Sequence, residues 1–484
     1  MSGFDRNRSG LGIAVLCVAQ FVVVLDATVV VSALPAMGRD LGFTPGGLQW
    51  VVTAYTLAFG GFLIVGGRVA DLVGSRRGFA IGLVGFTAAS LGCGLAPSPA
   101  LLLAGRVLQG VAAALLSPAA LALLTSITTS ASARRRGVGI WTAAAAGGGA
   151  TGWVLGGLLT EYADWRWVFF INVPVGVVVL PLIALVLPRA EGRRPEQLDA
   201  VGAVGVTLGL GLVVYGLTGA AELASRPLLV VVPVLAGIGV LAGVLWHERR
   251  VANPLLPADL LRGRAARGAN LAALLVTAST TPAMFLAVLY VQDLLDIPPG
   301  RAAWYFPALN LAVIAGSLLG PRLIGWIGSR CSAVAGFGLI AASALILTTL
   351  PSEGLPSARL LTSFSVMGVG LAIASVASTT VGTTEAVPSE RGLMSGLLNS
   401  AAQIGTALGL AVIIPLAARP ESDPEVMLNG MRWGFLGAGV IAVLGLAAGL
   451  LLPARDRGEP FAPDKVVTPP RLVSVDRRYG DSSR

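Results

Sequence analysis

Two ionisable side chains lie within long apolar runs, where a charge requires an explanation. Asp26 follows four consecutive Val and Leu residues, and Arg106 interrupts the apolar run that begins at Ala100. In hydrocarbon a charged side chain costs about 2.5–3.5 kcal/mol on insertion scales, so both should face an internal cavity. A carboxylate in such a cavity can take up and release a proton, and we predict proton coupling through Asp26 and Arg106. A permanent structural ion pair is the alternative that the sequence leaves open.

The residues that most enzymes use are almost missing from this chain. A phosphate-cradling loop needs a Lys before Ser or Thr, yet the only lysine is Lys465, close to the C-terminus. The only histidine is His247, at the end of an apolar stretch, and the three cysteines are far apart. A catalytic triad, a zinc site and a disulfide framework are therefore unsupported. We predict that the protein is not an enzyme and that it uses no cofactor and no metal.

The composition places most of the chain in lipid. Hydrophobic residues make up 55% of the 484 residues and charged residues 12%, with a mean hydropathy of +0.80. Apolar stretches of about 20 residues recur, and each can cross a hydrocarbon core of roughly 30 Å as a helix. The first stretch is too long for a removable signal peptide. The predicted spans are 11–33, 48–67, 79–97, 100–124, 138–159, 168–187, 199–220, 227–246, 269–292, 303–324, 332–350, 358–384, 393–416 and 433–453.

The positions of the basic residues predict the orientation. Most of them fall in the termini and in alternate loops, such as residues 134–136 and Arg249-Arg250. Because short loops that carry Lys and Arg stay in the cytoplasm, we predict a multi-pass protein of the cell membrane with both termini cytoplasmic. The net charge of +9 is spread over these loops instead of a soluble basic fold, which argues against nucleic-acid binding. In this orientation Asp26 and Arg106 fall at a similar depth in the outer half.

Two loops predict an internal repeat. Residues 68–76 follow the second span and residues 322–330 follow the tenth, and Arg, Gly, Ser and Arg recur in register. Two six-helix pseudo-repeats of the same orientation are typical of secondary transporters. We predict an all-α integral membrane protein of about 14 transmembrane helices, the two repeats plus two inserted helices. The predicted division is an N-terminal six-helix bundle at 1–187, a linker and two inserted helices at 188–250, a C-terminal six-helix bundle at 251–453 and a disordered cytoplasmic tail at 454–484.

Several motifs resemble those of one transporter family. Residues 25–35 read LDATVVVSALP, residues 67–77 read GRVADLVGSRR, residues 106–110 read RVLQG and residues 165–174 read WRWVFFINVP. Together they resemble the Major Facilitator Superfamily, in its 14-helix drug:proton antiporter branch, over essentially the whole membrane portion. The resemblance supports a coupling role for Asp26.

The acid and the bases of the loop at 67–77 predict a cytoplasmic gate. Arg68, Asp71, Gly74, Arg76 and Arg77 fall at the cytoplasmic ends of the second and third spans, where opposite charges can latch one domain to the other. Simple determination of topology by the basic residues is the alternative.

The fifth span departs from the family at one position. Residues 148–157 read GGATGWVLGG and align with the antiporter motif Gly-x-x-x-Gly-Pro-x-x-Gly-Gly. Gly148, Gly152, Gly156 and Gly157 match, while Trp153 stands in place of the proline. Proline favours a kink, so its absence removes the usual cause of a bend in this helix. The glycines still allow close helix packing.

The resemblance also places polar and aromatic residues around a central substrate cavity. Each can contact substrate, and each can equally hydrogen-bond between helices. They are Tyr55, Gln109, Asn310, Asn399 and Gln403.

Together with the residues above, the resemblance implies a proton-coupled secondary exporter of hydrophobic or amphiphilic drugs or antibiotics, working by alternating access. Its partners would be a small drug-like molecule, protons and the lipid bilayer. A facilitator or importer of a small metabolite, and a membrane receptor or scaffold without transport, remain alternatives because a fold does not determine function. The sequence does not indicate the substrate or the oligomeric state.

Overall fold

The structure is a computed structural model, and it describes residues 3–128, 130–188, 200–220, 225–251, 263–354, 357–385, 391–417 and 423–454. The predicted linker at 189–199 and nearly all of the predicted tail lie outside these residues. In the first part of the chain the helices are α1 (Gly3–Leu41), α2 (Pro45–Leu48), α3 (Trp50–Val73), α4 (Ser75–Gly94), α5 (Pro99–Ile127), α6 (Ala131–Tyr162), α7 (Trp167–Phe170) and α8 (Asn172–Val186).

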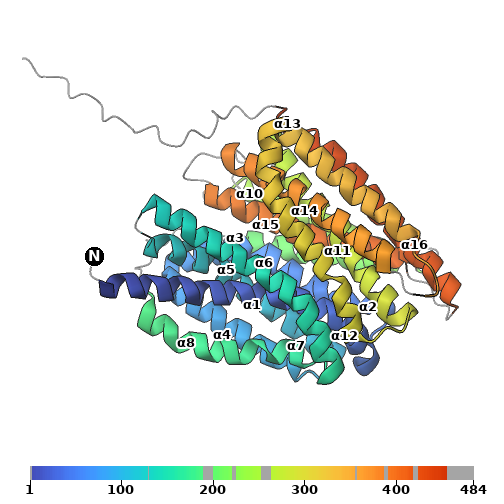
Figure 1. Ribbon diagram of the computed structural model, residues 1–484, viewed down its shortest axis with the longest axis horizontal. Helices are drawn as coiled ribbons and strands as arrows, with labels where there is room; N and C mark the ends of the chain where they lie inside the picture. Colours follow the sequence, from blue (N-terminus) through green and yellow to red (C-terminus); the bar gives the residue numbers. More distant parts are fainter. Residues whose placement is uncertain are drawn as a thin grey trace, which may run out of the picture.

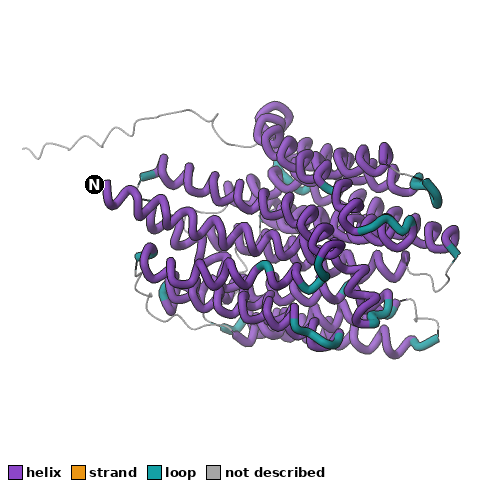
Figure 2. Tube along the Cα trace, turned by 60° about the horizontal axis from the view of Figure 1, so that its bottom comes forward, coloured by secondary structure: helices purple, strands orange, loops and turns teal. Residues whose placement is uncertain are grey.

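The helices continue through the second part of the chain. A π-helical turn, Tyr290–Leu294, ends α11, and a 3-10 turn, Ala303–Tyr305, precedes α13. No strand occurs in the described ranges, as Figure 2 shows. The remaining helices are α9 (Ala200–Thr218), α10 (Pro227–Glu248), α11 (Arg264–Leu289), α12 (Pro299–Ala302), α13 (Pro307–Thr348), α14 (Ser357–Glu385), α15 (Arg391–Ala417) and α16 (Pro424–Gly449).

Helix starts follow from local sequence. Pro99, Pro227 and Pro424 lie in the first turn of α5, α10 and α16, where the missing N–H has no helical partner to lose. The side chain of Ser130 caps α6, and that of Asp423 caps α16. Such signals position helix ends that hydropathy alone leaves undefined.

The predicted all-helical membrane fold is confirmed. Within the described residues, twelve helices are long and apolar enough to cross a membrane. One of these includes α13, which bends at Gly328 (φ 81°) and contains two predicted spans, and α6 with its 32 residues is not among the twelve. The number of fourteen spans therefore stays a prediction. The first span was predicted too short, because α1 continues through Pro35 to Leu41.

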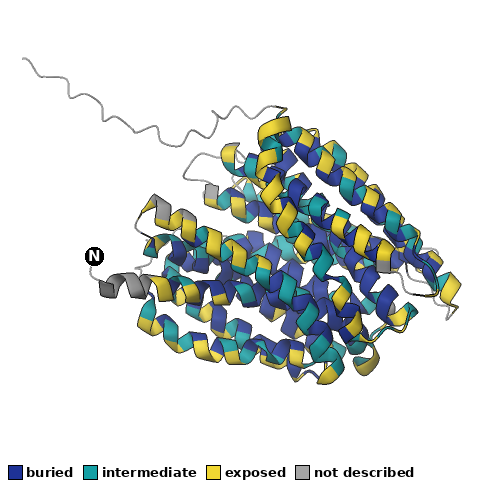
Figure 3. Ribbon diagram, in the orientation of Figure 1, coloured by how far each residue is buried: buried dark blue, intermediate teal, exposed yellow. Residues whose placement is uncertain are grey.

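The spanning helices pack in two groups (Figure 1). The first group consists of α1 and α3 to α8, and the second of α11 to α16. The pair α9 and α10 pack on each other, and α9 also contacts α3 of the first group and α15 of the second. Figure 3 shows that buried residues lie between helices and exposed residues on the outer faces. Many of the exposed residues are large and apolar. This pattern is expected of a protein whose solvent is hydrocarbon.

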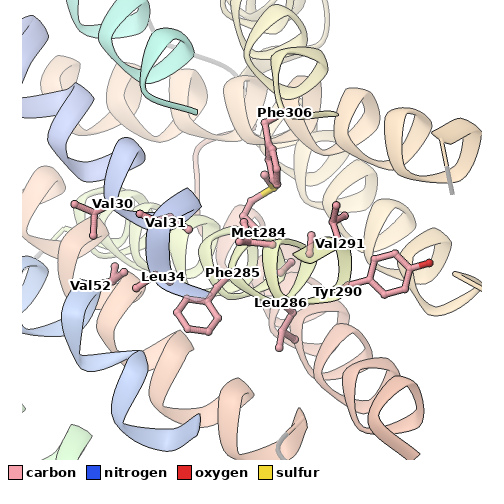
Figure 4. Packing of buried hydrophobic residues seen from close by; sticks show 14 of the residues in the cluster. Val30, Val31, Leu34, Val52, Met284, Phe285, Leu286, Tyr290, Val291 and Phe306 are labelled. Atoms are coloured by element: carbon pink, nitrogen blue, oxygen red, sulfur yellow. The ribbon is translucent and has the colours of Figure 1, made fainter. Parts of the chain in front are cut away.

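The molecule has two distinct ends. We call the end where α1 begins the terminus end, and the opposite end, where α2 and α12 lie, the far end (Figure 1). Near the far end, apolar residues of both groups pack together: Val31 and Leu34 of α1 lie close to Met284 and Phe285 of α11 (Figure 4). The two groups are thus joined by a hydrophobic core at this end.

Polar contacts also join the groups at the far end. Arg39 pairs with Asp293 at 3.1 Å, and the Gln292 side chain donates a hydrogen bond to the Ser32 carbonyl at 3.0 Å. The backbone N–H of Gly300 donates to a Glu161 carboxylate oxygen at 2.6 Å. The far end is therefore closed in this conformation.

Candidate functional site

The charges at Asp26 and Arg106 meet inside the first group. Arg106 Nη1 lies 2.6 Å from Asp26 Oδ2, and the two side chains are 1% and 0% exposed. The Nε of Arg106 donates to the Val51 carbonyl at 2.9 Å. Asp26 and Arg106 were expected at a similar depth along α1 and α5, and in the structure the carboxylate and the guanidinium are in direct contact. Such a pair is stable in a dry interior only when its remaining polar atoms are also hydrogen-bonded.

Three neutral polar side chains complete the site. The Nε2 of Gln109 donates to Asp26 Oδ1 at 2.9 Å and to Ser90 Oγ at 2.8 Å, and Gln109 Oε1 accepts from Arg106 at 2.7 Å. The Nδ2 of Asn172 donates to the same Asp26 oxygen at 2.8 Å. The carboxylate therefore accepts from three donors on α5 and α8. We call Asp26, Ser90, Arg106, Gln109 and Asn172 the polar network.

Aromatic rings enclose the guanidinium. The Cζ atom of Arg106 lies 4.3 Å from the ring centre of Tyr55 and 5.8 Å from that of Phe169, so the cation faces π-systems as well as acceptors. Among the described residues the buried Tyr55 hydroxyl and the Asn172 Oδ1 find no hydrogen-bond partner. Unpartnered buried polar atoms are costly, so these two, one in the polar network and one on the ring beside Arg106, give the site capacity for rearrangement or for water.

A cavity of about 360 Å³ lies between the two groups. None of the described residues in its wall is charged, and hydroxyl and amide groups are set among apolar ones. A larger hollow of about 810 Å³ is lined by α3, α4, α5 and the loop between α4 and α5, and none of the described residues in its wall comes from the second group. The polar part of the central cavity wall is Thr28, Thr56, Thr280, Thr281, Asn310, Gln403 and Thr406.

Helix α1 separates the polar network from the cavity. Asp26 points into the first group, while its neighbours Ala27 and Thr28 belong to the cavity wall. Successive helix residues point in different directions, so one turn of α1 contacts both sites. A shift of α1 would alter the network and the cavity together.

The glycines of the fifth predicted span are positions of close helix contact. A Cβ atom added at Gly148, Gly152 or Gly156 would lie 2.3, 1.9 or 2.0 Å from an atom of α1. One at Gly157 would lie 2.4 Å from the Pro299 carbonyl of the second group. Three glycines thus face α1 on successive turns of α6, and the fourth faces the other group, as small residues do at tight helix crossings.

Trp153 lies at the contact between the groups. Its ring stacks on Phe306 with centres 4.5 Å apart and planes 7° apart, and Phe306 in turn stacks on Phe364 at 5.2 Å. Trp153 also belongs to the cavity wall. Helix α6 is continuous from Ala131 to Tyr162. The residue that stands where the family has proline is thus a packing contact between the groups.

The predicted gate residues lie where α3 meets α4. Gly74 adopts φ 87° between the two helices, a conformation that favours glycine. Arg76 donates to the Ala184 carbonyl of α8 at 2.9 Å, a contact within the first group. Arg68 is half-buried, and Asp71 and Arg77 are exposed.

The matching loop in the second group repeats this geometry. Gly328 has φ 81°, and Arg330 donates to the Leu452 carbonyl just after α16 at 2.9 Å. In each group a left-handed glycine is thus followed by an arginine that binds the end of that group's last long helix. This geometry supports the predicted repeat.

The five predicted cavity residues fall in three places. Asn310 and Gln403 belong to the cavity wall. Tyr55 and Gln109 are buried around Arg106, on the other side of α1. Asn399 is exposed and is not among the wall residues.

Sequence reasoning did not assign roles to several site residues. Asn172 lies within the motif at 165–174, and its position opening α8 was the available signal. Ser90 and Thr406 carry no distinguishing pattern, because single hydroxyl residues are common in membrane helices. Only the fold brings them to the network and the cavity.

Comparisons with known proteins agree with one another. A family model described as Major Facilitator Superfamily matches residues 16–410. A puromycin resistance protein of Streptomyces alboniger is 36% identical over 482 residues, covering 96% of this chain and 95% of its own length. A cephamycin export protein of Amycolatopsis lactamdurans is 38% identical over 463 residues, covering 92% of each chain.

A solved structure shares the fold. A bacterial homologue of the human drug peptide transporters superposes with a TM-score of 0.65 at 17% identity, covering 91% of this chain and 97% of its own. At that identity the likeness concerns architecture alone.

Proposed function

The chain belongs to the Major Facilitator Superfamily, and from this premise we propose that it exports hydrophobic or amphiphilic drug-like compounds in exchange for protons. It is a membrane transporter and not an enzyme. Relatives named for antibiotic resistance and export, similar over nearly the whole chain, support the direction of transport.

The terminus end faces the cytoplasm in this proposal. The excess of basic residues in the loops of that end supports this orientation. The far end then faces outward, and the conformation is closed to the outside by the contacts of Arg39, Glu161 and Gln292. Alternating access requires these contacts to break when the cavity opens outward.

Residues 1–187 and 251–453 act as the two moving halves. The helix packing within each group, and the repeated glycine and arginine at Gly74-Arg76 and Gly328-Arg330, support this division. Gly74, Arg76 and their neighbours Arg68, Asp71 and Arg77 form the cytoplasmic gate, which engages the other half when the inner end closes. The glycines of α6 allow α1 and α6 to move together as a tightly packed pair.

The observation that carries the proposal is the placement of Asp26 on α1, with Ala27 and Thr28 in the cavity wall. A proton on Asp26 removes the charge that Arg106 binds, and the guanidinium then has only neutral acceptors, among them the Val51 carbonyl and Gln109. The weakened pair frees α1 to shift, which changes the cavity wall. Proton binding and drug binding are thereby linked through one helix.

The cavity wall favours neutral or weakly charged compounds. None of the described wall residues carries a charge, so a multivalent cation would lose hydration without gaining a counter-charge. Threonine hydroxyls and the amides of Asn310 and Gln403 offer hydrogen bonds to polar groups on an otherwise apolar ligand.

The test is drug-dependent proton flux in sealed proteoliposomes under an imposed pH gradient, with puromycin as the first compound. The wild type should move drug and protons together, and Asp26→Asn should abolish the coupled flux. Asp40→Asn is the matched control, because Asp40 lies on the same helix and pairs with Arg166 at 2.9 Å but is half exposed. It should retain coupling.

Other outcomes identify the alternatives. Unchanged coupling in Asp26→Asn would remove this carboxylate from the mechanism. Drug movement that ignores the gradient would indicate a facilitator, accumulation of the compound in cells an importer, and binding without flux a receptor.

A further inference from the structure

The two seams between the helix groups differ. One seam, between α3 and α15, is packed along its length. Leu57 clusters with Ala407 of α15 and Val214 of α9, and a Cβ on Gly60 would lie 2.8 Å from the Gln403 side chain. Ile64 packs on a cluster of second-group residues that includes Met394 and Leu397 of α15.

The inserted pair α9 and α10 strengthens this first seam. Helix α9 contacts both α3 and α15, and a Cβ on Gly61 of α3 would lie 2.1 Å from the Thr207 hydroxyl of α9. A helix that packs on both groups at once covers the line between them. Compounds in the lipid cannot pass to the cavity through this side.

The other seam, between α6 and α13, is joined near the far end. There Gly157 faces Pro299, Trp153 stacks on Phe306, and a Cβ on Gly149 would lie 3.9 Å from the Asn310 side chain. These contacts fall within the last 14 residues of α6 (Gly149 to Tyr162), the part of the helix that contacts α12 and the start of α13.

The exposed part of the cavity wall lies at this second seam. Of the described residues in its wall, two are exposed: Ala146 of α6 and Ile314 of α13, the latter at 42%. Ala146 lies one turn of α6 closer to the terminus end than Gly149, and Ile314 lies one turn of α13 closer to that end than Asn310. The neighbouring outer residues Ile140 and Leu311 are exposed and apolar. An apolar rim beside an uncharged cavity suits a compound dissolved in hydrocarbon.

We propose that the transported compound enters the central cavity sideways from the bilayer, between α6 and α13, while α9 and α10 keep the opposite seam shut. The inference rests on the proposed export function and adds its route. A hydrophobic compound is concentrated in the membrane relative to water, so an opening at membrane depth samples it at a higher concentration than an aqueous entrance. The inserted pair then gives the transporter one lateral entrance instead of two.

Chemical labelling tests the route without any need for transport. In a Cys331→Ser background, which removes the exposed native cysteine, Ala146→Cys should react with a lipid-soluble pyrene maleimide at least tenfold faster than with a membrane-impermeant sulfonated maleimide. Leu311→Cys, on the outer face of α13 and 66% exposed, is the lipid control, and Glu353→Cys, in an exposed loop, is the water control. Equal or faster labelling of Ala146→Cys by the sulfonated reagent would show an aqueous opening and overturn the proposal.

Blocking the seam tests its use. Ala146→Trp and Ile314→Trp should lower the initial rate of transport of rhodamine 6G loaded into the vesicle bilayer at least tenfold. Because both residues belong to the cavity wall, the Kd of the dye is measured for each variant in detergent and the rates are compared at equal occupancy. Leu311→Trp, which is outside the cavity wall, should transport within twofold of the wild type. Normal rates in both seam variants would refute lateral entry, whereas a wild type that moves neither rhodamine 6G nor puromycin under any gradient would refute the export function itself.

Discussion

The Asp26–Arg106 pair should behave as one unit in the stability of the protein. Asp26→Asn leaves a guanidinium buried with only neutral acceptors, and Arg106→Gln leaves a carboxylate buried with only neutral donors. Removing one partner of a buried pair costs about 3–5 kcal/mol. If the two effects were independent, the double variant would lose about 6–10 kcal/mol by their sum.

The double variant Asp26→Asn/Arg106→Gln should instead lose less than either single variant. It leaves no buried charge, and replacing both members of a buried pair is often close to neutral. Asn and Gln side chains can still hydrogen-bond to Gln109 and Asn172. The expected coupling energy is therefore several kcal/mol.

The assay is equilibrium unfolding in mixed micelles titrated with sodium dodecyl sulfate, followed by tryptophan fluorescence. The matched cycle uses Asp40→Asn and Arg166→Gln, an ion pair of the same residue types whose side chains are 47% and 30% exposed. Exposed pairs contribute about 0–1 kcal/mol, so this cycle should show little coupling. Losses that add in the Asp26 cycle, or single losses below about 1 kcal/mol, would refute a desolvated, interdependent pair.

Three further predictions follow from contacts elsewhere. Gly156→Ala should destabilise the protein by about 1–3 kcal/mol in the same unfolding assay, because the added Cβ would lie 2.0 Å from an atom of α1. Gly139→Ala on the same helix is the control and should leave the stability unchanged, because the space around Gly139 is open. Trp153→Ala removes the stack on Phe306, which is worth about 0.5–1.5 kcal/mol. The share of molecules whose far end is open should therefore rise roughly two- to tenfold, as measured by distances between spin labels on α1 and α11. An unchanged distance distribution would contradict this prediction. Arg39→Gln should change the free energy of unfolding by at most about 1 kcal/mol, because this pair is exposed, and a larger loss would show that the contact is desolvated.

Much of the fold follows from one-dimensional properties of the sequence. Lipid accepts only segments whose backbone groups are paired internally, so long apolar runs had to be helices. The rise per residue then placed Asp26 and Arg106 at one depth, and the structure brings their side chains to 2.6 Å. The motifs that carry these residues also led to the family, because they combine fixed spacing with rare residue types.

Helix rotation was not available from the sequence. A soluble helix shows its inner face by an apolar stripe, whereas α1, α8 and α9 are apolar on nearly every face. The resemblance placed Tyr55 and Gln109 around the cavity, and the structure places them around Arg106 on the other side of α1. Helix ends were uncertain because hydropathy, averaged over a window of residues, falls gradually where a helix ends. The extension of α1 to Leu41 shows this.

The sequence by itself determined that the chain is a bundle of membrane helices of this family with a buried acid and a buried base, because length, hydropathy and motif spacing are local properties. The tertiary structure alone decided that Asn172 and Ser90 complete the polar network, that Trp153 meets Phe306 across the groups, and that Ile314 belongs to the cavity wall. These facts depend on how helices distant in sequence rotate and tilt against one another. Packing sets those rotations, and no single helix encodes them.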